Sequence, residues 1–146
     1  MRYWFEKYYP FAIAVIITLL IYKFEDYMAE LKTLIPQVAQ NSLTISGTLL
    51  GFLLTILTII NTINTRRMQF VKSTGNFDRL SSFLNLAIKA NIFLILTSFF
   101  IIFINPDKFN NNILQLVNFS FIFITVFAIS LTIRFAVIFI KLLTDG

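Results

Sequence analysis

The sequence predicts an all-α polytopic membrane protein with four transmembrane helices and with both termini in the cytoplasm. The first observation is composition: 58% of the 146 residues are hydrophobic, 13% are charged and 18 are Phe. The second is a set of four charge-poor stretches, each able to cross or nearly cross a bilayer of about 30 Å. The third is the uneven distribution of Lys and Arg between the segments that join them. We expect one domain, 1–146, with helices at about 8–24, 42–66, 86–105 and 113–134 and a basic cytoplasmic hairpin at about 66–82.

The first helix, at about 8–24, follows Arg2 and Lys7 and has a short apolar core. A cleaved signal peptide has the same order of features, but no convincing small-residue cleavage site follows Tyr22. We therefore interpret it as a retained helix. The outward loop after it contains Glu25, Asp26 and Glu30. This loop is either an ordinary interfacial segment or an acidic vestibule in an oligomer.

The second helix, at about 42–66, lies in a charge-free run over residues 33–65. Seven small or hydroxyl residues recur there at alternating spacings of four and three, which places them on one helix face. We call this set the threonine stripe: Thr44, Thr48, Gly51, Thr55, Thr58, Thr62 and Thr65. The other faces of the same helix are almost entirely Leu and Ile.

Two interpretations of the threonine stripe are open. Thr hydroxyls in membrane helices bond to their own backbone or across helices, and Gly47 with Gly51 forms a small-xxx-small pair that permits close helix packing. The stripe is then a dry packing face. Alternatively, rings of hydroxyls around the axis of an oligomer are polar enough to hold water and too weak to trap an ion. One chain is too small to enclose such a lumen, so a pore requires a homo-oligomer.

The third and fourth helices, at about 86–105 and 113–134, each carry a cation near one end. Lys89 either extends to the cytoplasmic interface or faces a water-filled interior. Arg134 is followed by another apolar turn and a half, and Lys141 lies one heptad further along.

Orientation follows from the positive residues, which are retained on the cytoplasmic side. One side of the predicted topology has Arg2, Lys7, Arg66, Arg67, Lys72, Arg79, Lys89, Arg134 and Lys141. The other side has Lys23, Lys32 and Lys108. We therefore expect a multi-pass protein of the cell inner (cytoplasmic) membrane. Contact with anionic lipids or a partner protein is expected at Arg66, Arg67, Lys72, Arg79, Lys89, Arg134 and Lys141.

Catalysis is not expected. Cys and His are both absent, which excludes disulfides, thiol nucleophiles, imidazole bases and the usual zinc sites. Among the seven acids only Glu25, Asp26 and Glu30 cluster, without a partner base. We expect no cofactor and no metal. The net charge of +5 reflects the positive-inside topology rather than a nucleic-acid surface.

A resemblance covers the second helix and the hairpin. Gly47-Thr48, Thr65-Arg66-Arg67, Lys72 and Gly75, in a chain of this length and topology, resemble RexB of bacteriophage lambda and related small four-helix membrane proteins of prophage and anti-phage (abortive infection) loci. The membrane subunit of the Kiwa defence system has a similar organisation. In this group a membrane subunit depolarises the cell when a soluble partner triggers it. The apolar segments here match only in character, being richer in Phe, Ile and Asn.

With this resemblance added, we expect an oligomeric membrane channel or membrane-depolarising effector of bacterial anti-phage defence, triggered through a soluble cytoplasmic partner. The alternative is a non-conducting membrane anchor or scaffold that recruits a cytoplasmic protein.

Overall fold

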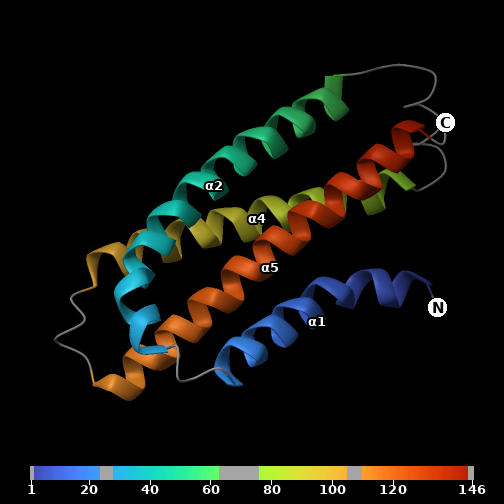
Figure 1. Cartoon of the computed structure of the whole chain (residues 1–146). Coiled ribbons are helices and arrows are strands. Elements are labelled where there is room, and N and C mark those ends of the chain that lie inside the picture. Colours follow the sequence, from blue (N-terminus) through green and yellow to red (C-terminus); the bar gives the residue numbers. More distant parts are fainter. Residues whose placement is uncertain (1, 24–27, 63–75, 105–109, 145–146) are drawn as a thin grey trace.

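The fold is all-helical, and the computed structural model describes residues 2–23, 28–62, 76–104 and 110–144. Within these ranges four helices follow in order (Figure 1): α1 (Arg2–Lys23), α2 (Met28–Thr62), α4 (Asn76–Phe103) and α5 (Asn111–Thr144). Three contain stretches long and apolar enough to cross a membrane, Ile35–Thr62, Leu80–Phe103 and Ile113–Lys141, whereas the apolar part of α1, Tyr8–Ile21, is shorter. The expected helical membrane architecture is confirmed at this level.

All four described helices extend beyond the stretches expected from charge, α1 by beginning at Arg2. Helix α2 begins at Met28, α4 begins at Asn76 and α5 continues to Thr144. Pro36 lies inside α2, and Pro10 lies inside α1. A proline removes one backbone donor from a helix, and membrane helices tolerate it where neighbouring helices restore the bonding. Charge marks where a helix leaves the membrane and not where the helix itself ends, which explains the extra turns.

The helices lie in an open row rather than a closed four-helix bundle. Helix α1 packs on α5, α5 packs on α4 and α4 packs on α2, while α2 touches α5 at few positions. Figure 1 shows the same order, with α2 and α1 on opposite sides of the α4–α5 pair. Helix α2 is therefore an edge helix whose main neighbour is α4.

The core divides into two hydrophobic clusters along the row. The first cluster lies where α2 ends and α4 begins, and its buried members are Leu53, Ile56, Ile60, Leu80, Leu84, Ala87, Leu131 and Phe135. The second cluster lies towards the start of α2 and the end of α4, and comprises Ile35, Ala39, Leu94, Ile101, Phe121 and Ala128. Between them each of these helices buries polar side chains: Ser42, Ser46, Asn91, Ser130 and Thr132. We call these five residues the polar layer.

Candidate functional site

The threonine stripe lies on the uncovered face of α2. Its six members within the described residues, Thr44, Thr48, Gly51, Thr55, Thr58 and Thr62, are all exposed. The buried residues of α2 run from Ile35 through Leu53 to Ile60 on the face that meets α4. At roughly 100° per residue, the stripe lies about half a turn from that face. The stripe therefore does not pack within the subunit. Thr65 lies outside the described residues.

Every hydroxyl of the described stripe donates its hydrogen bond to a carbonyl of its own helix, four residues earlier. The donor–acceptor distances are 3.1 Å for Thr44, 3.0 Å for Thr48, 2.9 Å for Thr55, 3.0 Å for Thr58 and 2.8 Å for Thr62. The protons are thus occupied, whereas the oxygen lone pairs and the methyl groups remain available on the outer surface. Such a surface accepts hydrogen bonds from water without requiring them.

The stripe continues towards the start of α2, beyond the residues identified from the sequence. Gln37, Gln40 and Asn41 are exposed and precede Thr44 at the same helical spacing. The spacing was available in the sequence, but the predicted helix began only at about residue 42. A strip of polar or small residues therefore follows the uncovered side of α2 from Gln37 to Thr62, and exposed apolar side chains, Phe52 at 53% and Leu54 at 45% among them, flank it.

The outer face of α4 has the opposite character after Lys89. Four large apolar side chains on it are strongly exposed: Phe93 at 54%, Leu96 at 62%, Phe100 at 66% and Phe103 at 72%. These residues lie opposite the buried face of α4 and are suited to lipid chains. The row thus presents a polar strip along α2 and an apolar outer face on the second half of α4, a contrast that only the three-dimensional packing reveals.

Gly47 and Gly51 do not mediate packing between helices of one chain. Both are exposed, and a Cβ built on either glycine would meet no atom within 4 Å apart from its chain neighbours and the adjacent backbone of its own helix. Small residues do permit close approach inside the subunit, but they are Ala39, Ser42 and Ser46, on the buried face. Close packing at the two glycines, if a second chain approaches, remains a prediction.

The basic residues expected at the membrane surface differ in environment. Lys89 and Lys141 are exposed. Arg134 is buried, with 6% of its surface exposed, and its guanidinium carbon lies 4.0 Å from the centre of the Phe83 ring. Arg134 and Lys141 therefore do not present one common surface. Arg66, Arg67, Lys72 and the side chain of Arg79 lie outside the described residues.

A polar pair joins α4 to α5 at the polar layer, which sequence reasoning had not identified. The Asn91 amide donates to Thr132 Oγ1 at 2.8 Å and to the Ala87 carbonyl at 2.9 Å, and the Thr132 hydroxyl donates to the Ala128 carbonyl at 3.0 Å. Asn91 is 0% exposed, and its Oδ1 accepts no hydrogen bond from the described residues. The two side chains are far apart in sequence, so no local pattern indicates the contact.

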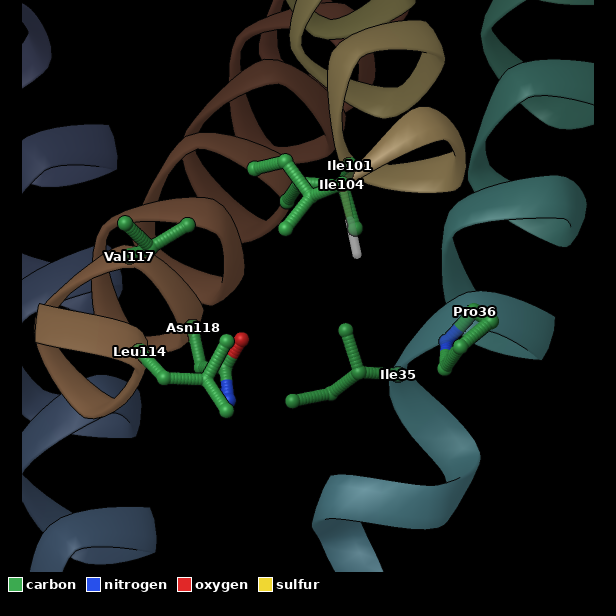
Figure 2. A pocket seen from close by; sticks show the side chains of 7 residues that line it. All are labelled: Ile35, Pro36, Ile101, Ile104, Leu114, Val117 and Asn118. Atoms are coloured by element: carbon green, nitrogen blue, oxygen red, sulfur yellow. The ribbon is translucent and has the colours of Figure 1, made fainter. Parts of the chain in front are cut away.

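A small pocket of about 50 Å³ lies where the start of α2 meets the end of α4 and the start of α5. Figure 2 shows Ile35 pointing from α2 towards Leu114 and Asn118 of α5. Asn118 supplies the only polar side chain among the lining residues. The pocket has room for a few water molecules and is far smaller than the roughly 300–1,000 Å³ of typical ligand sites.

Among the described residues, no three Asp or Glu side chains lie together in a way that could hold a metal ion. No family model matches the chain, and no curated protein or solved structure matches it either.

Proposed function

We propose that the chain is the subunit of a homo-oligomeric membrane channel in which α2 of every copy faces a common axis. One observation carries this proposal: the threonine stripe and its amide extension lie on the uncovered face of an edge helix, opposite the face that packs on α4. A face of this kind is poorly suited to lipid, because an amide in an apolar medium without a partner costs roughly 2–7 kcal/mol.

The contrast with α4 supports this assignment. Exposed Phe93, Leu96, Phe100 and Phe103 give α4 an outer face of ordinary lipid-facing character. In a ring of subunits, α4 then contacts the bilayer while α2 points inwards. Since the four helices of one chain form an open row, several copies are needed to enclose a lumen.

The chemistry of the lining follows from the hydrogen bonds of the stripe. Thr44, Thr48 and Thr55 each direct their protons to their own backbone, so their oxygens are left to accept from water. Neutral acceptor oxygens hydrate a pore without binding an ion tightly, and a permeant ion must leave its sites easily.

The biological setting rests on the resemblance to the small membrane subunits of anti-phage loci. On that ground the proposed channel depolarises the inner membrane in anti-phage defence, and a soluble cytoplasmic protein triggers it through the basic hairpin at about 66–82.

The test is ion flux through purified protein in liposomes, read with a potential-sensitive dye. Thr48→Leu, which places an apolar ring in the proposed lumen, should abolish flux. Thr97→Leu is the matched control, because the Thr97 hydroxyl also donates to its own helix, at 2.9 Å to the Phe93 carbonyl, but lies on α4. Flux that is measurable in the wild type and equal in Thr48→Leu would overturn the pore assignment.

A non-conducting anchor or scaffold is the second candidate, and the same hydrogen bonds favour it. Since the described hydroxyls already have acceptors in their own helix, the stripe can pack against another chain without water. This candidate predicts that an intact wild-type oligomer conducts nothing even when its soluble partner is added, and that Thr48→Leu changes oligomer stability alone.

A further inference from the structure

We infer that the membrane surface on the basic side of the protein lies at the level of Lys89 and Arg134, where lipid phosphates meet Lys89. Roughly three turns of α2, α4 and α5 then project beyond the bilayer as a three-helix extension. The depth of Lys89 and Arg134 in the bilayer is the same whether or not the protein conducts ions.

The register between α4 and α5 sets the common level. The Asn91 amide lies 2.8 Å from Thr132 Oγ1, which fixes these two positions side by side. The helices run in opposite directions, so two residues back along α4 and two residues forward along α5 reach Lys89 and Arg134. The two cations therefore share one level although they lie on different helices.

The outer face of α4 changes character at this level. Ser82, Asn85 and Lys89 are exposed and lie on the face opposite the core, at roughly 100° per residue. After Lys89 in the sequence, the same face carries Phe93, Leu96 and then further aromatic residues. A lipid-facing helix shows this change where it enters the headgroup region, and a Lys ammonium there reaches the phosphates.

Two estimates from helix length lie on either side of the same level. The hydrocarbon core of a bilayer, about 30 Å, takes about 20 helical residues. Counted from Ile104, where α4 has just ended, this length reaches about residue 85. Counted from Ile113, near the start of α5, it reaches about residue 132. Both estimates fall within about one and a half turns of Lys89 and Arg134.

The aromatic residues of α1 agree with this level. The Phe11 ring lies 5.6 Å from that of Phe123 and 6.4 Å from that of Phe127, which places the start of α1 beside this part of α5. Tyr8 and Tyr9, nearly a turn nearer the start of α1, are 49% and 42% exposed. Tyr side chains concentrate at membrane–water interfaces, so they mark the surface within a turn or two of Arg134.

Beyond this level, part of the first hydrophobic cluster forms the core of the extension, including Ile60, Leu80 and Phe135. These residues hold the three helix ends together without help from lipid. Because Ile60 of α2 packs in the same cluster as Leu80 of α4, Thr58 and Thr62 also lie in the extension, and the part of the stripe within the bilayer ends near Gly51 and Thr55.

The test measures the depth of nitroxide labels on single cysteines in lipid bilayers, from their relative accessibility to oxygen and to a water-soluble nickel chelate. Labels at Ser82 and Asn85 should favour the nickel chelate, and labels at Leu96 and Phe100 should favour oxygen. All four positions point outwards, so the labels do not disturb the core.

Val137 on α5 supplies the sharpest position, because it is apolar and 60% exposed. Composition alone would place it in lipid, whereas the inferred level places it outside the hydrocarbon. A label there that favours the nickel chelate supports the extension. Labels at Asn85 and Val137 that are as accessible to oxygen as the label at Leu96 would overturn the inference.

Discussion

The hydrogen bond between Asn91 and Thr132 allows a quantitative prediction from a double-mutant cycle. Asn91→Leu and Thr132→Val each remove this bond, and both residues are buried, at 0% and 4% exposure. In Asn91→Leu the Thr132 hydroxyl keeps its acceptor, the Ala128 carbonyl at 3.0 Å, so no donor is left without a partner. Interhelical bonds of this kind in membranes contribute about 0.6 kcal/mol on average and at most about 1.7 kcal/mol. We expect a coupling free energy in that range.

Asn91→Leu should lose less free energy of unfolding than the removal of a buried hydrogen bond usually costs. Asn91→Leu also removes Oδ1, which accepts no bond from the described residues and whose burial costs about 1–3 kcal/mol. The free energy of unfolding should therefore stay within about 1 kcal/mol of wild type or rise, because these terms oppose each other.

The assay is reversible unfolding in mixed lipid–detergent micelles, with Thr125→Val as the matched control. Thr125 is on the same helix and its hydroxyl donates only to the Phe121 carbonyl, at 2.9 Å. The coupling free energy between Thr125→Val and Asn91→Leu should equal zero within an error of about 0.3 kcal/mol. Equal coupling for Thr125 and Thr132, or a loss above about 3 kcal/mol in Asn91→Leu alone, would refute the reasoning.

Three further outcomes are expected. Leu84→Ala, at a position 0% exposed, should lower the free energy of unfolding by about 2–5 kcal/mol, whereas Leu96→Ala, at 62% exposure, should change it little; equal losses would contradict the assigned core. A single Cys at Asn111 should react with an impermeant thiol reagent in intact cells and one at Gly146 should not, and the reverse pattern would invert the topology. Gly51→Leu should alter the oligomer measured by native mass spectrometry without unfolding the subunit, because no other helix of its own chain lies within 4 Å of a Cβ at this position; an unchanged oligomer would mean that this position faces lipid.

The helical content was predictable from the sequence because a membrane requires long uncharged helices. Helix ends were less predictable, since charge reports the position of water: α4 begins at Asn76, well before the uncharged stretch that follows Lys89. The spacing of the threonines fixed their common face. It could not tell whether that face met a neighbour in the chain, because both arrangements have the same periodicity.

The buried polar residues were the least predictable part. Asn91 and Ser98 are both 0% exposed and lie on the same face as Leu84 and Leu94, where helical periodicity predicts apolar side chains. The bond from Asn91 to Thr132 depends on the register between two helices, which no local pattern contains. Arg134 is buried for a similar reason, since its site is formed in part by Phe83 from another helix.

The central claim is that the uncovered face of α2 lines a water-filled lumen, and the most direct measurement is the conductance of Thr48→Cys protein in a planar bilayer. The chain has no native Cys, so a charged methanethiosulfonate reagent added from the aqueous phase modifies only the introduced thiol. We expect the conductance to fall on modification, while Leu96→Cys protein, with its label position on the lipid-facing side of α4, is unaffected. A conductance that the reagent leaves unchanged in Thr48→Cys protein would contradict the account.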